Sequence, residues 1–121
     1  MTTTSPKEST IVVSLSKKMR GRGWLVTKIH GGPHQRAGLP DLMVIVPPHG
    51  LTFWVEVKRP GGVLTKLQEA TAGKLREAGS PVYVATSSED HIVEWLEREM
   101  VMRISMLRFG FPWWQSKLVL G

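Results

Sequence analysis

Two carboxylates and one amine are spaced so that a hairpin would bring them together. Asp41 begins one apolar stretch, and Glu56 and Lys58 end the next. A hairpin that turns between Pro48 and His49 sets Asp41 directly opposite Glu56, with their β-carbons about 5 Å apart. Glu56 and Lys58 are two residues apart on one strand, so they project from the same face. Two acids and one base therefore converge on one point.

Charged groups are costly to place among apolar strand residues unless they are paired or bind a metal. One interpretation is structural, a salt bridge of Lys58 with either Asp41 or Glu56. This pairing leaves one carboxylate without a cation, and Mg²⁺ resolves the imbalance because it prefers hard oxygen ligands. A metal that activates water and neutralises charge on a phosphate, beside a lysine that positions the water or stabilises the transition state, indicates phosphodiester hydrolysis.

The charge of the chain favours a polyanionic partner. The 121 residues carry a formal net charge of +6, and the pI is about 10.1. Residues 1–40 hold seven basic side chains against one acidic, whereas residues 41–121 hold nine of each. This excess is typical of nucleic-acid binding, although a solvated helix surface explains a charge run equally well. The residues expected to bind nucleic acid are Lys17, Lys18, Arg20, Arg22, Lys28, His34 and Arg36.

Composition excludes several other classes of protein. The length suits one domain, and hydrophobic and charged fractions of 41% and 21% are those of a folded chain. The absence of cysteine excludes disulfide scaffolds, thiol chemistry and cysteine-ligated zinc. No run approaches the roughly 18 apolar residues of a membrane span, and the first residues lack the pattern of a secretory signal. We therefore expect a cytoplasmic protein with no membrane association.

The segment that precedes the two strands is expected to form a helix. Ser5 suits the N-cap, Pro6 suits the first helical position, and Glu8 completes a capping box. Gly21 is expected to end this helix. Its inward side would carry the apolar residues that recur at helical spacing, Ile11, Val12, Leu15 and Met19.

The remaining elements complete an α/β domain of order α-β-β-β-α-β-α, assigned to residues 1–100. The strands are predicted over 24–29, 42–46, 51–58 and 82–85, and further helices over 65–78 and from residue 87 or 88 onward. Residues 101–121 form an apolar tail whose pattern leaves three alternatives open: an extension of the last helix, an edge strand, or a contact with a second subunit.

The motifs resemble those of a nuclease family. One motif resembles that of the PD-(D/E)xK superfamily: Gly38-Leu39-Pro40-Asp41 followed by Glu56-Val57-Lys58. Together with Glu8, Arg36 and Gln68, the pattern over residues 5–86 is similar to the VRR-NUC (virus-type replication-repair nuclease) family. The resemblance implies a restriction-endonuclease-like fold, a mixed sheet flanked by helices, in a viral or bacterial setting such as a phage-infected cell.

The resemblance also implies roles for individual residues. Asp41 and Glu56 match metal ligands, with the carbonyl of Val57 completing the protein's share, and Lys58 matches the catalytic lysine. Gln68 matches a glutamine that orients water or contacts the scissile phosphate. The implied metal is Mg²⁺, with Mn²⁺ as a substitute.

Glu8 and Gln68 each have a second interpretation. The resemblance implies that Glu8 binds the metal directly or through water, yet Glu8 stands three residues after Ser5 and Gln68 three residues after Thr65. A capping box accounts for either residue. A side chain that caps its own helix is not expected to face the site as well, so the two roles compete.

The resulting prediction is a metal-dependent DNA endonuclease, selective for branched DNA in the manner of a Holliday-junction resolvase. A domain of this size has little surface for base readout. Two symmetric cuts in a two-fold junction imply a homodimer, with residues 109–114 as the candidate contact. The alternatives are a flap or nonspecific nuclease of replication and repair, a DNA-binding module whose acids form only a salt bridge, and a subunit that needs a partner protein for activity.

Overall fold

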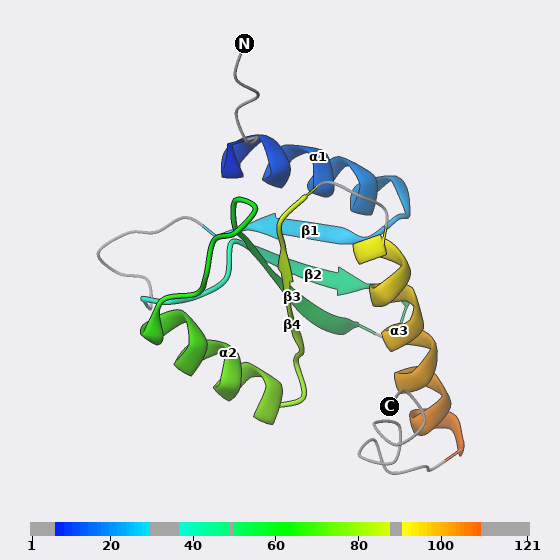
Figure 1. The fold of residues 1–121 in the computed structure, drawn as a ribbon. Helices are drawn as coiled ribbons and strands as arrows, with labels where there is room; N and C mark the ends of the chain where they lie inside the picture. The colour runs from blue at the N-terminus through cyan, green and yellow to red at the C-terminus, as the bar shows by residue number, and fades with distance from the viewer. Residues whose placement is uncertain (1–6, 30–36, 49, 88–90, 110–121) are drawn as a thin grey trace. The chain divides into compact units, whose positions relative to one another are not determined.

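The computed structural model describes residues 7–29, 37–48, 50–87 and 91–109, in two compact units, Met1–Glu89 and Asp90–Gly121. Figure 1 shows the elements, and their order α-β-β-β-α-β-α confirms the predicted α/β fold class. None of the helices in the described part is long and apolar enough to cross a membrane. The elements are α1 (Glu8–Gly21), β1 (Leu25–Lys28), β2 (Leu42–Val46), β3 (Leu51–Val57), α2 (Lys66–Glu77), β4 (Val82–Ala85) and α3 (His91–Phe109).

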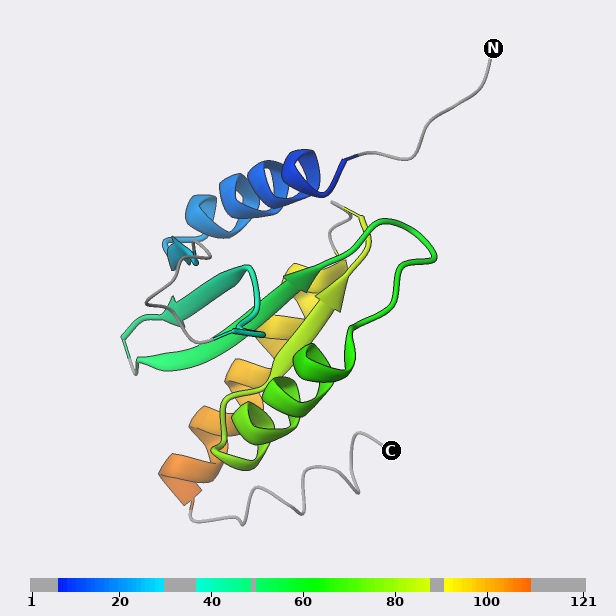
Figure 2. The same ribbon diagram turned by 90° about the vertical axis from the view of Figure 1, so that its left-hand side faces the viewer.

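The four strands form one mixed sheet in the order β1-β2-β3-β4 (Figure 2). The pairs β1–β2 and β2–β3 are antiparallel, and β3–β4 is parallel. Leu42 pairs with Val55 and Val44 with Phe53. This register is the one predicted for a turn between residues 48 and 49, and it follows from the alternation of apolar side chains on both strands.

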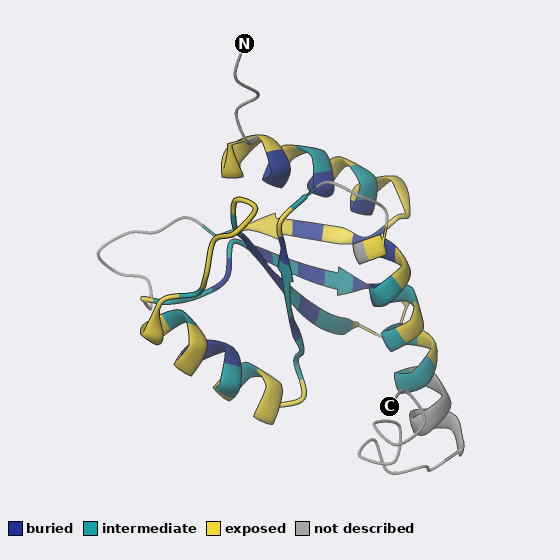
Figure 3. Ribbon diagram, viewed as in Figure 1, coloured by how far each residue is buried: buried dark blue, intermediate teal, exposed yellow. Residues whose placement is uncertain are grey.

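One face of the sheet forms the hydrophobic core. Burial of such apolar side chains stabilises the fold by about 1.5–3 kcal/mol each. Figure 3 shows buried positions along the strands and on the inward side of α1. The side chains at most 2% exposed in β2, β3 and α1 are Leu42, Val44, Val46, Phe53, Val55, Val57, Ile11, Leu15 and Met19. The other face carries Met43 and Trp54, which are partly exposed, and Glu56.

The start of α1 differs from the prediction. The N-cap is Lys7, which makes no side-chain capping bond, and the helix begins at Glu8. The expected capping box of Ser5 with Glu8 is therefore wrong, and Ser5 itself lies outside the described residues. The physical reason is that the Glu8 carboxylate has another partner, because its Oε2 accepts a hydrogen bond from the backbone N–H of Arg59 at 3.3 Å.

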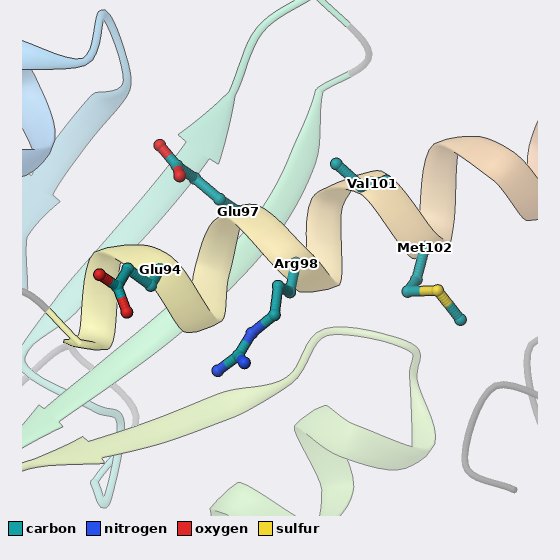
Figure 4. Close-up of a pocket in the computed structure, with 5 residues that line it drawn as sticks. All are labelled: Glu94, Glu97, Arg98, Val101 and Met102. Carbon is teal, nitrogen blue, oxygen red and sulfur yellow. The ribbon is translucent and has the colours of Figure 1, made fainter. Parts of the chain in front are cut away.

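The second unit is described through α3 alone. This helix continues to Phe109, so helix extension holds for the first part of the predicted tail, whereas residues 110–121 lie outside the described residues. A shallow open depression of about 480 Å³ lies on α3. Figure 4 shows the five side chains that line it: Glu97 and Val101 point to one side of the helix, and Glu94, Arg98 and Met102 point to the other. Val101 is 57% exposed. No residue of the predicted site lies on this helix.

Gly38 fixes the approach of α2 to the chain that enters β2. Its φ is +84°, a conformation that side chains rarely adopt. A β-carbon at this position would lie 2.8 Å from Thr71 Oγ1 and 2.9 Å from Leu67 Cγ. A larger residue therefore cannot be accepted here without moving α2.

We expect Gly38→Ala to lower the free energy of unfolding by about 2–4 kcal/mol, because it combines a positive-φ penalty with overpacking. Urea unfolding measures the change. Gly73→Ala is the matched control: Gly73 lies inside α2, and an added β-carbon meets nothing within 4 Å. Alanine at this helical position should stabilise by about 0.5–1 kcal/mol. Equal effects of the two substitutions would contradict the close approach at Gly38.

Candidate active site

Asp41 is fixed to the neighbouring strand by its side chain. Its Oδ2 accepts a hydrogen bond from the backbone N–H of Val57 at 2.7 Å. Its backbone carbonyl accepts a second bond from Ile29 N–H at 2.8 Å. The residue just before β2 therefore joins the ends of β1 and β3, and its carboxylate cannot swing away from the sheet. This arrangement agrees with the predicted position of Asp41 opposite Glu56.

Glu56 is a carboxylate buried in the central part of the sheet. It is 4% exposed, although it belongs to the partly exposed face. The pKa of Glu56 is raised from 4.5 to about 8. The largest cause is burial, followed by the charge of Asp41 and a hydrogen bond with Asp41, and the charge of Glu8 also raises the pKa. Lys58 acts in the opposite direction and lowers the pKa. The two acids thus lie within electrostatic reach of each other and of one ammonium group.

Val57 is the last residue of β3, and the backbone N–H of Lys58, which follows it, points to the opposite side from the N–H of Val57. The Lys58 N–H donates to the carbonyl of Ala85 in β4 at 2.9 Å. Because the N–H and C=O of a trans peptide point in opposite directions, the Val57 carbonyl points away from β4, toward the side of Asp41. Lys58 is half-buried, and its i, i+2 relation to Glu56 places both side chains on one face.

Gln68 caps α2, and its side chain also faces Glu56. Its backbone N–H donates to Thr65 Oγ1 at 3.2 Å, and its side-chain Oε1 accepts from the Thr65 backbone N–H at 2.9 Å, which completes a capping box. Its Nε2 donates to Glu56 Oε1 at 3.4 Å. The expectation that a capping side chain cannot face the site is therefore wrong, because the two ends of one amide serve the two purposes.

Glu8 reaches the edge of the site from α1. The bond from Arg59 N–H ties the first residue of α1 to the chain that follows Lys58. Arg59 was not singled out in the sequence; its position directly after the Glu-Val-Lys motif is the signal that would have found it. Gly38 belongs to the quoted motif, but its packing role was not predicted, since spacing alone does not reveal a positive φ.

The residues predicted to bind nucleic acid fall into separate groups. Lys28 ends β1 next to Ile29, whose N–H binds the Asp41 carbonyl, so its backbone lies near that of Asp41. Pairing with the buried Leu42 turns the exposed side chain of Lys28 to the sheet face opposite to Glu56. Lys17, Lys18, Arg20 and Arg22 lie at the other end of α1, about 14–21 Å along the axis from Glu8. Arg20 also donates from Nη2 to the carbonyl of Val26 at 3.1 Å. His34 and Arg36 lie outside the described residues.

The donor set of the site fits a hard divalent cation. Two carboxylates of like charge face each other, and a cation is what stabilises both in the ionised form. Within the described ranges, no three Asp, Glu, His or Cys side chains form a metal-ligand cluster. The protein's share would therefore be Asp41, Glu56 and the Val57 carbonyl. Mg²⁺ suits such a set, because it binds through one or two carboxylates and keeps positions for water and phosphate.

The raised pKa of Glu56 predicts that the metal-free protein loses stability as pH rises. The folded state binds the Glu56 proton more tightly than the unfolded state, so the loss begins near pH 4.5 and is complete above about pH 8. We expect Glu56→Gln to remove most of this pH dependence. At pH 8, the free energy of unfolding of the variant should exceed that of the wild type by on the order of 3 kcal/mol.

Urea unfolding in EDTA at several pH values between 5 and 8.5 measures this difference. The control is Glu69→Gln, which replaces an exposed glutamate on α2 and should leave the wild-type pH dependence in place. A Glu56→Gln protein with the same pH dependence as the wild type would show that Glu56 is not desolvated in the fold.

Two solved structures are similar to this fold. A solved structure described as a VRR_NUC domain is 27% identical, with a TM-score of 0.63; the match covers 74% of this chain and 94% of the other. A second, described as a VRR_NUC domain protein, is 18% identical with a TM-score of 0.55, covers 78% and 88% of the two chains, and shows likeness of fold. No curated protein matches the sequence.

The profile of the VRR-NUC domain matches residues 4–89, which include every residue of the site described above. The match spans more than half of the chain and ends where the first compact unit ends. The chain therefore belongs to the VRR-NUC domain family, a family of nucleases.

Proposed function

We propose that the chain is a Mg²⁺-dependent DNA endonuclease that cleaves branched DNA as a homodimer. The observation that carries the proposal is the fixed pair of carboxylates, with Asp41 held by Val57 N–H at 2.7 Å beside a Glu56 that is 4% exposed. A buried pair of carboxylates lowers stability unless a bound cation compensates their charge. Carboxylates with strongly perturbed pKa values cluster at functional sites. A bound Mg²⁺ would lower the pKa of a water molecule and neutralise charge that develops on the phosphate.

The chain's own residues have distinct tasks in this mechanism. Asp41 and Glu56 hold the cation, and the sheet fixes their separation. Lys58 lies on the face of Glu56, where its ammonium group can position the attacking water or stabilise the charged transition state. Glu8 would bind the cation directly or through water, because the bond that its Oε2 accepts from the Arg59 N–H leaves its second carboxylate oxygen for either contact. The products that the family resemblance implies are 5′-phosphate ends.

DNA binding is assigned to two groups of basic residues. The backbone of Lys28 lies near that of Asp41, and the basic end of α1 lies about 14–21 Å from Glu8 along the helix axis. At 3.4 Å per base pair, the distance from Glu8 to the basic end of α1 corresponds to roughly four to six base pairs, so a stretch of DNA that passes the site can also contact that end of the helix. Such contacts position the substrate without reading its sequence, which supports selectivity for DNA structure.

The homodimer follows from the substrate. A four-way junction has two equivalent strands to cut, and a two-fold enzyme presents two sites to them. The exposed Val101 on α3 supports this assembly, because an exposed apolar side chain of this size is available for contact with a second copy. The proposed contact from residues 109–114 begins at the last described residue of α3.

We expect the protein to make paired symmetric cuts in a labelled four-way junction and none in a matched linear duplex, with Mg²⁺ or Mn²⁺ and not with EDTA. Asp41→Ala and Lys58→Ala should each lower the cleavage rate by at least about 100-fold. Denaturing gels measure the rate and cut positions. Lys74→Ala, which removes an exposed lysine from the last turn of α2, is the control for loss of charge alone.

Three other results would each contradict part of the proposal. Cleavage of flaps or single strands in place of junctions would retain the nuclease and exclude the resolvase. Single unpaired cuts would exclude the dimer as the active form. DNA binding without cleavage under any of these conditions would exclude intrinsic activity and favour a subunit that needs a partner.

Salt dependence tests the assignment of the DNA surface. We expect log Kd for an uncleaved junction to depend linearly on log salt concentration, measured in Ca²⁺ or EDTA by fluorescence anisotropy. Lys28→Ala and Lys17→Ala should each reduce the slope by about 1. Lys74→Ala again serves as the control. A slope that neither substitution changes would exclude these residues as phosphate contacts.

A further inference from the structure

We propose that Thr65 is a positioning residue of the site, because its backbone N–H holds the side-chain oxygen of Gln68 and so turns the Gln68 amide nitrogen toward Glu56. The inference rests on the proposed function in one respect, the treatment of Glu56 as a metal ligand. It assigns a role to a residue that touches neither metal nor substrate.

The chemistry of the two partners fixes the orientation of the amide. A backbone N–H can only donate, so the Gln68 atom that faces Thr65 N at 2.9 Å must be the oxygen. The other end of the same amide is then a donor, and it meets Glu56 Oε1 at 3.4 Å. Rotation of the amide by 180° would place two donors together at Thr65 and two acceptors together at Glu56. The capping box therefore selects one orientation.

The position of α2 determines how far this amide can move. Gln68 stands next to Leu67 and on the same helix as Thr71, the two residues that lie closest to Gly38. Gly38 in turn precedes Asp41 by three residues. The segment from Gly38 to Asp41 thus sets the position of Asp41 directly and the position of Gln68 through its contact with α2. Both residues that contact Glu56 are therefore positioned by the same short stretch of backbone.

The fixed orientation restricts what Gln68 can do. Its oxygen faces Thr65 and its nitrogen faces Glu56, so the end of the amide nearest the proposed metal ligand is a donor and not an oxygen ligand. Its nitrogen carries two N–H groups. One donates to Glu56 and orients that carboxylate, and the second can meet a phosphate oxygen. Outer partners of this kind typically change metal affinity by about 10–100-fold when they are removed.

The test compares Mn²⁺ binding by the full chain, measured by isothermal titration calorimetry, in Thr65→Pro, Thr65→Ser, Gln68→Met and the double variant Thr65→Pro/Gln68→Met. Thr65 has φ −69°, which proline adopts, so Thr65→Pro removes the N–H, together with the hydroxyl that accepts the Gln68 backbone N–H, without a conflict of φ at this position. Thr65→Ser keeps both groups of the capping box. Ala70→Gly weakens α2 at an exposed position outside the box and controls for helix stability.

We expect Thr65→Pro and Gln68→Met each to weaken Mn²⁺ binding about tenfold. The double variant should be no weaker than either single variant, since Thr65 acts through Gln68. Thr65→Ser should retain the wild-type affinity, and Ala70→Gly should not change it. Additive losses in the double variant, or an equal loss in Ala70→Gly, would overturn the proposal.

A second measurement on the metal-free protein separates this proposal from the proposed function. In ¹⁵N-labelled wild type, the Gln68 side-chain amide protons should exchange with water more slowly than in Thr65→Pro, as nuclear magnetic resonance measures. If exchange is slowed in this way but the wild type binds no Mn²⁺, the positioning of Gln68 stands and the metal-dependent function fails. If exchange is equally fast in both proteins, Thr65 does not position Gln68.

Discussion

The bond from Val57 N–H to the Asp41 carboxylate is the interaction on which the site depends. The paired part of the β2–β3 hairpin ends at Leu42 and Val55, and beyond it the side chain of Asp41 takes the place of a strand carbonyl. The Asp41 carboxylate thus extends the hydrogen bonding of the hairpin by one bond, and the main chain of β3 sets the position of that carboxylate. The same arrangement buries a second acid, Glu56, close to Asp41. Burial and the nearby charge disfavour the ionised form of Glu56 and so raise its pKa.

Three other elements are arranged around this hairpin so that each brings one polar group to Glu56 or to its neighbours. The strand β4 binds the backbone of Lys58, the helix α2 brings the amide of Gln68, and the helix α1 brings the carboxylate of Glu8 to Arg59. The bond to Lys58 joins two backbones, the bond from Gln68 joins two side chains, and the bond to Glu8 joins a side chain to a backbone N–H. All three end on β3 or on the residues that follow it, and the apolar face of the sheet already fixes that strand. The precision of the site therefore comes from the core, although no core side chain takes part in the proposed chemistry and Val57 would contribute only its backbone carbonyl.

The sequence predicted the fold class, the hairpin register and the convergence of Asp41 and Glu56, because alternating apolar residues such as Val44 and Phe53 leave one register that buries them together. It failed at Ser5, since a local capping pattern carries no information about Arg59, a partner 51 residues away from Glu8 in the chain. It set the two roles of Gln68 in opposition because spacing describes a residue as a single point, whereas an amide has a donor end and an acceptor end. The packing of Gly38 against α2 was equally out of reach, since it depends on a tertiary contact.

The parallel pairing of β3 with β4 has a consequence for the order in which the chain folds. The hairpin of β2 and β3 closes over a few residues, so its formation costs little loop entropy and is expected early. The β3–β4 pair has to wait for the whole of α2 to be placed between the two strands, which makes it a slower, non-local step. Lys58 receives its backbone partner Ala85 in that later step, and Gln68 arrives with α2. The carboxylate pair is thus created before the groups that moderate it, and a nascent chain carries the acids of the site without its lysine and glutamine in place.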